Sequence, residues 1–106
     1  MSLDYGMEKL DMSLHYLSGS ESKTERLFNA VTYSLMDIKP KFELPESLQG
    51  DFETLITELT TVKSIDDKES VLATINSFDE VELSEAIEKI INLHASANVI
   101  TNQTNL

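Results

Sequence analysis

The chain has 106 residues, with 19 acidic and 8 basic side chains, no cysteine, no tryptophan and a formal net charge of −11 at pH 7. This length supports one domain whose core forms without disulfides or a structural metal. The lack of cysteine excludes thiolate metal sites, iron–sulfur clusters and cysteine nucleophiles. A surface this negative disfavours direct binding to nucleic acid or anionic membranes and favours basic partners.

Sequence signals for secretion, for a membrane span and for nucleic-acid binding are also weak. The N-terminal residues are acidic, with no apolar segment of the signal-peptide type, and no apolar run approaches the roughly 20 residues of a membrane span. Arg26 is the single arginine and the seven lysines are scattered, so there is no basic stripe for a base-stacking groove. We therefore expect a soluble, cytoplasmic protein that does not bind nucleic acid or membrane directly.

The N-terminal segment has the spacing of an amphipathic helix. Its apolar residues alternate at intervals of four and three: Leu3, Met7, Leu10, Leu14 and Leu17. This periodicity predicts a helix over residues 3–18 that packs against its neighbours at shallow angles. Gly19 can take the left-handed conformation that closes such a helix.

Residues 22–38 are predicted to form a second helix. Ser22, followed three positions later by Glu25, has the pattern of a capping box. Pro40 disfavours helical geometry at the residue before it and so ends this helix. The connector over residues 39–46 contains two prolines with apolar residues between them, and we expect it to lie folded down on the other helices.

A third helix is predicted over residues 45–61. Pro45 suits its first position, where the missing N–H costs nothing, and the apolar residues that follow repeat the four-three spacing. Gly50 lies inside this helix and costs about 1 kcal/mol relative to alanine unless a close helix contact or fraying uses it.

Two further capping patterns divide the rest of the chain. They are Asp66 with Glu69 and Asp79 with Glu82. They predict helices over residues 66–77 and 80–97. Because the connections are short, we predict an all-α fold, an up-and-down bundle of four to five helices with antiparallel neighbours. It forms a single domain over residues 1–98, and the polar tail over residues 99–106 is expected to be frayed or disordered.

The search for catalytic or metal-binding chemistry centres on the two histidines. Asp11 and His15 lie one helical turn apart and can share a metal with Glu8, but all three lie off the leucine seam of their helix. His94 is better explained at the rim of the core, or as a core histidine with a hydrogen-bond partner, than as a ligand or an acid–base group. We therefore predict no enzyme, catalytic residue, cofactor or metal. The alternative is a small metal-dependent enzyme that uses these groups with helix carboxylates.

Two groups of residues are predicted to contact a protein partner. One is a second apolar stripe on the first predicted helix, offset from its leucine seam: Tyr5, Met12 and Tyr16. The other is an acidic run within ten residues: Asp79, Glu80, Glu82, Glu85 and Glu88. The stripe is explained equally well by a central position of its helix or by a covering connector, and the run is also typical of a solvated helix face.

A series of short motifs occurs over residues 21–60: Arg26-Leu27, Ala30, Ser34-Leu35, Lys39-Pro40 and Leu44-Pro45, followed by a Leu/Phe-Glu helix. This pattern resembles a group of small, uncharacterised all-α bacterial proteins of unknown function. The resemblance implies a helical fold and carries no activity. The two proline motifs bracket a predicted connector, which is a structural role.

The sequence favours a non-enzymatic protein–protein interaction or regulatory module that acts through helix faces. Its expected partner is a basic protein, or a second copy of the chain in a homodimer. An acidic inhibitor that imitates nucleic acid toward a DNA- or RNA-binding protein is a further alternative.

Overall fold

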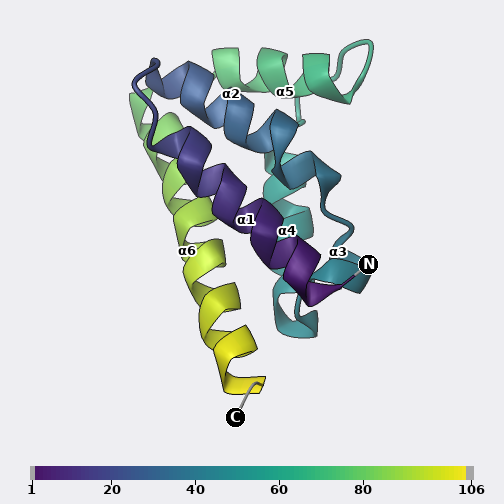
Figure 1. The fold of residues 1–106 in the computed structure, drawn as a ribbon. Helices are drawn as coiled ribbons and strands as arrows, with labels where there is room; N and C mark the ends of the chain where they lie inside the picture. The colour runs from purple at the N-terminus through teal and green to yellow at the C-terminus, as the bar shows by residue number, and fades with distance from the viewer. Residues whose placement is uncertain (1, 105–106) are drawn as a thin grey trace.

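The structure, a computed structural model, describes residues 2–104 (Figure 1). Its elements are α1 (Leu3–Leu17), α2 (Lys23–Tyr33), the 3₁₀ helix η1 (Leu35–Asp37), α3 (Pro40–Glu43), α4 (Glu46–Glu58), α5 (Asp67–Asn76) and α6 (Glu80–Thr104). The predicted all-α class is confirmed, since these residues contain helices and no strand. The predicted four to five helices are too few, because the described chain forms six α-helices. None of them is long and apolar enough to cross a membrane.

All three predicted caps form. Ser22 caps α2 and Asp66 caps α5, each accepting the backbone N–H three residues later, at 3.2 and 2.8 Å. Asp79 and Glu82 make the full reciprocal box at the start of α6: the Glu82 N–H donates to Asp79 Oδ1 at 2.8 Å, and the Asp79 N–H donates to Glu82 Oε1 at 2.9 Å. These side chains satisfy N–H groups that have no partner inside the helix.

The second predicted helix does not run unbroken to residue 38. It stops at Ser34, which leaves helical geometry with a φ of −139°, and the chain resumes as η1. Ser34 is completely buried, and its hydroxyl donates a hydrogen bond to the backbone carbonyl of Lys9 in α1. A contact between two helices therefore interrupts a segment whose local sequence favours continuous helix.

The connector lies folded on α1, as predicted, and forms the short helix α3. Leu44 is buried, whereas Phe42 remains 52% exposed. Gly6 of α1 lies against the backbone of Glu43 in α3, with no room for a side chain between them. Pro45 precedes α4 as its cap residue and is not the first helical residue.

Of the other two glycines, Gly19 does not have the predicted role and Gly50 makes no close contact. No glycine has a positive φ, so Gly19 does not close α1 in a left-handed conformation. Instead Ser18 caps α1, and its backbone N–H donates to the carbonyls of Leu14 and His15. Gly50 faces open space, so no close helix contact explains it.

Helix α6 ends seven residues later than the predicted Ala97. At 1.5 Å per residue its 25 residues span about 37 Å. Ala97 is completely buried and Ile100 packs against the core, so the apolar face continues into a segment that is polar in composition. Residues 99–104 are therefore helical, and residues 105 and 106 of the predicted tail lie outside the described residues.

Helix α1 occupies a central position, because it packs against α2, α3 and α6 (Figure 1). Helix α5 packs on α2, and α4 packs on α6. The largest completely buried hydrophobic side chains come from most of these elements: Leu10, Leu27, Leu35, Leu59, Ile75, Ile90, Val31 and Val71. One continuous core results, and its surface is hollowed at the boundary between α4 and α6 and also where η1 meets α4.

Candidate functional site

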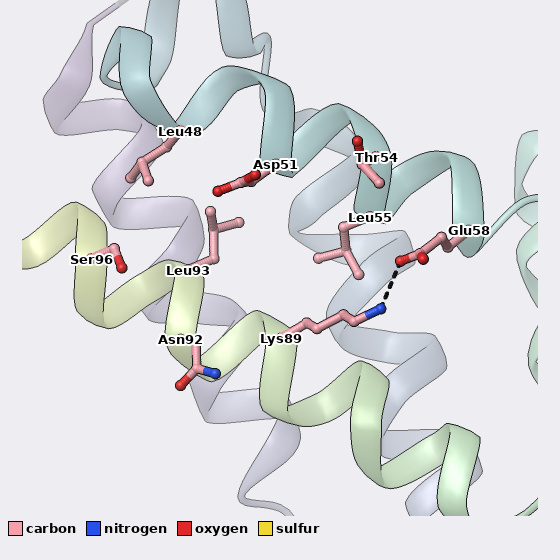
Figure 2. Close-up of a pocket in the computed structure, with 9 residues that line it drawn as sticks. All are labelled: Leu48, Asp51, Thr54, Leu55, Glu58, Lys89, Asn92, Leu93 and Ser96. Carbon is pink, nitrogen blue, oxygen red and sulfur yellow. Dashed lines mark hydrogen bonds and ion pairs between the residues drawn. The ribbon is translucent and has the colours of Figure 1, made fainter.

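Two adjoining cavities lie between α4 and α6. The first has a volume of about 310 Å³ and is lined by Leu48, Asp51, Thr54, Leu55, Glu58, Lys89, Asn92, Leu93 and Ser96 (Figure 2). The second has a volume of about 330 Å³ and is lined by Leu55, Glu58, Leu59, Thr61, Phe78, Glu82, Glu85, Ala86 and Lys89. Because they share three residues, the two cavities form one elongated depression, which we call the α4/α6 groove.

The floor of the α4/α6 groove consists of core residues. Leu48 and Leu55 come from α4 and Leu93 from α6, and each is at most 7% exposed. Figure 2 shows Leu55 and Leu93 between the two helices. Side chains held this firmly by packing present a surface of fixed shape. The amphipathic pattern that builds the core therefore also builds the floor of the groove.

The rim of the α4/α6 groove is acidic. Its four carboxylates belong to Asp51, Glu58, Glu82 and Glu85, and its one ammonium belongs to Lys89. Lys89 Nζ reaches across from α6 to Glu58 Oε1 on α4 at a distance of 3.0 Å (Figure 2). Both side chains are about half exposed, so water weakens this ion pair. After that pair is counted, the rim keeps an excess of three negative charges.

The residues of the predicted acidic run have different neighbours. Glu82 and Glu85 line the α4/α6 groove, and Asp79 is occupied in capping α6. Glu80 pairs with Lys23 of α2 at 2.8 Å, and Glu88 is exposed and lines neither cavity of the groove.

The predicted apolar stripe of α1 is partly covered by the chain itself. Tyr16 packs against the core, with its ring centroid 6.2 Å from that of Tyr33. The ammonium of Lys9 lies 5.6 Å from the centroid of the Tyr5 ring. Tyr5 and Met12 are half-buried. The central position of α1 accounts for the contact made by Tyr16, and it leaves parts of Tyr5 and Met12 at the surface.

His94 joins the first helix to the last. Its Nε2 lies 2.6 Å from Asp11 Oδ1, and its side chain is 19% exposed, which places it at the rim of the core. Asp11 thus pairs with His94 across the α1–α6 contact, whereas His15 is exposed. Over the part of the chain that the structure describes, no three histidine or carboxylate side chains converge as metal ligands would.

Lys9 forms a second link between elements. Its Nζ donates to Asp37 Oδ2 at 3.1 Å and so ties α1 to η1. The hydrogen bond to Asp37 raises the pKa of the Lys9 ammonium above its ordinary value, although partial burial acts in the opposite direction. Both effects follow from holding a charged group beside a carboxylate and partly away from water.

Several residues of the α4/α6 groove were not predicted from the sequence. Asp51, Glu58 and Lys89 were not singled out, although they complete the rim. One signal was available: Leu48, Asp51, Leu55 and Glu58 follow one another at spacings of three and four. That spacing places leucines and carboxylates on one face of a helix, but it does not reveal which other helix this face meets.

Comparison with known proteins finds no family model, curated protein or solved structure that matches this chain. The resemblance of residues 21–60 to small bacterial helical proteins therefore stays a prediction.

Proposed function

We propose that this chain is a non-enzymatic interaction module, built as an up-and-down helical bundle, that binds a basic protein through the α4/α6 groove. The observation that carries the proposal is the combination of a leucine floor with a carboxylate rim. Protein-binding sites commonly pair an apolar centre with a polar border. The groove supplies both from two helices that the core holds in place.

Charge supports a basic partner. The chain carries a net charge of −11, and the rim itself has an excess of carboxylates. Such a field attracts cationic surfaces from a distance and speeds their encounter, and salt weakens it. Carboxylates around an apolar centre also disfavour acidic competitors, which adds specificity.

The same charge argues against a second copy as the partner in the α4/α6 groove. Two copies would each carry −11, and the one arginine already donates within the chain, from Arg26 Nη1 to the Leu17 carbonyl at 2.9 Å and from Nε to the Glu21 carbonyl at 3.0 Å. A homodimer through Tyr5 and Met12 of α1 is the alternative, since these side chains are half-buried and lie outside the groove.

The proposal is tested by zero-length carbodiimide cross-linking, which joins a carboxylate to a lysine that touches it. The full chain is cross-linked in extract of its native cells, and the linked residues are mapped by mass spectrometry. We expect links from Asp51, Glu58, Glu82 and Glu85 to lysines of one basic protein, lost at high salt. Links spread evenly over all exposed carboxylates, or links only between copies of the chain, would contradict the proposal.

A further inference from the structure

We infer that the α4/α6 groove accepts one amphipathic α-helix of the partner, about four turns long, with basic side chains beside its apolar stripe. This inference rests on the proposed function and specifies the form of its partner. It follows from the length of the groove, the chemistry of its floor and the distribution of its charges.

The length of the groove matches a short helix. On α6 the lining residues extend from Glu82 to Ser96, which is about 21 Å at the helical rise. Along α4 and its C-terminal cap residue they run in the opposite order, since Leu48 lies at the Ser96 end and Leu59 at the Glu82 end. A helix of about 14 residues has the same length, and two helical walls offer it ridges to pack between.

The apolar floor favours a helix over an extended peptide. The groove is lined mainly by side chains of α4 and α6, whose backbone groups are already bonded within those helices, with Leu59, Thr61 and Phe78 added from the connections. The described chain has no strand edge for a peptide to join. An extended segment would therefore bring unpaired N–H and C=O groups against leucine side chains, which is unfavourable. A helix satisfies its own backbone and presents only side chains to the floor.

The charges of the groove give the bound helix a polarity. Glu58, Glu82 and Glu85 gather around the second cavity, whereas Asp51 is the one carboxylate that lines only the first. The other polar residues of the first cavity include Asn92 and Ser96, which are uncharged. The partner's lysines and arginines are therefore expected to be densest over the Glu82 end.

The Lys89–Glu58 ion pair crosses the groove between its two cavities, so a bound helix displaces it. Figure 2 shows the Lys89 side chain extending past Leu55 to reach Glu58. Both charged groups are about half exposed, so the pair is weak and opens readily. A cation of the partner then takes the place of Lys89 at Glu58, and the departure of the Lys89 stem uncovers more of Leu55.

The probe for this inference is a synthetic 14-residue amphipathic peptide of leucine and lysine, compared with a scrambled peptide of the same composition. Binding to the full chain is measured by fluorescence anisotropy, and peptide helicity by circular dichroism. We expect the amphipathic peptide to become helical and to bind at least tenfold more tightly than the scrambled one. Equal binding of the two peptides would reduce the interaction to general charge attraction and overturn the inference.

Two pairs of variants locate the binding. Glu82→Gln with Glu85→Gln should weaken peptide binding several-fold, whereas Glu8→Gln with Glu88→Gln removes the same charge from exposed positions outside the groove and should have a much smaller effect. Ser96→Trp should block the first cavity, whereas Ala95→Trp at the exposed neighbouring position should not. Binding unaffected by Ser96→Trp would place the peptide elsewhere.

Failure of the helix inference can be distinguished from failure of the proposed function. If the peptides do not discriminate but the carbodiimide links still map to the groove rim, the module binds a basic partner of another shape, and only the helix inference fails. A self-association that Ser96→Trp abolishes and Ala95→Trp preserves would assign the groove to a second copy of the chain, and it would overturn the inference.

Discussion

Gly6 of α1 and Glu43 of α3 meet so closely that a Cβ on Gly6 would lie 1.9 Å from the carbonyl oxygen of Glu43. No real carbon and oxygen atoms approach to that distance without a covalent bond, and the oxygen belongs to the backbone. The contact is therefore possible only with glycine at position 6. It fixes the connector between η1 and α4 against the first helix of the chain.

Gly6→Ala is expected to destabilise the fold by about 1–3 kcal/mol, because α1 and α3 must separate to admit the methyl group. Denaturant unfolding monitored by circular dichroism measures this loss. A variant as stable as the parent would mean that α3 does not rest on α1 at this point.

Gly50→Ala should have the opposite effect. A Cβ at this position of α4 meets no atom within 4 Å, and the backbone is helical. Replacing glycine with alanine restricts the unfolded chain and adds about 0.5–1 kcal/mol to the free energy of unfolding. The same unfolding assay tests it, and a loss of stability would show that this turn of α4 makes a contact absent from the structure.

The hydrogen bond between His94 and Asp11 is expected to contribute a coupling energy of about 0.5–1.5 kcal/mol, the range of single hydrogen bonds in proteins. It is measured with a double-mutant cycle of Asp11→Asn and His94→Gln. His15→Gln should leave stability unchanged, since His15 is exposed and has no such contact with Asp11. Additive effects of Asp11→Asn and His94→Gln would mean that the two helices are held together without this pair.

The pairing of Lys9 with Asp37 predicts a stability change at alkaline pH. Because the hydrogen bond to Asp37 raises the pKa of Lys9 in the folded state, the ammonium is held more tightly there than in the unfolded chain. The resulting stabilisation is complete below the ordinary value of 10.5 and is lost as pH rises through the higher folded pKa. The difference in unfolding free energy between the parent and Asp37→Asn should therefore be positive at pH 9 and shrink above 10.5. A difference that stays constant across this range would contradict the assignment.

The helix starts were predictable because their signals are local. Ser22, Asp66 and Asp79 each act on an N–H group three residues away, so sequence spacing alone reveals them. The break at Ser34 was not predictable in this way. Its cause is a hydrogen bond to Lys9, 25 residues earlier, and the local pattern continues as helix.

The late end of α6 was missed for a related reason. The asparagines and threonines that follow Ala97 have the composition of a frayed tail. One apolar side chain among them, Ile100, packs on the core, and the helix continues past it to Thr104. The groove depends even more on tertiary structure. Glu82 and Asp51 lie 31 positions apart, and only the packing of α4 on α6 brings their helices to the same depression.

The contact between α1 and α6 also determines when the fold can be completed. Asp11 and His94 are separated by 83 positions, and α6 supplies Leu83, Ile90 and Ala97 to the core. During synthesis the chain emerges from its N-terminus, so the surfaces of α1 and α4 that face α6 stay open to water until α6 is made. A shortened chain that ends before Glu80 would leave the apolar surfaces of α1 and α4 that face α6 exposed to water. We expect it to aggregate instead of persisting as a smaller folded protein.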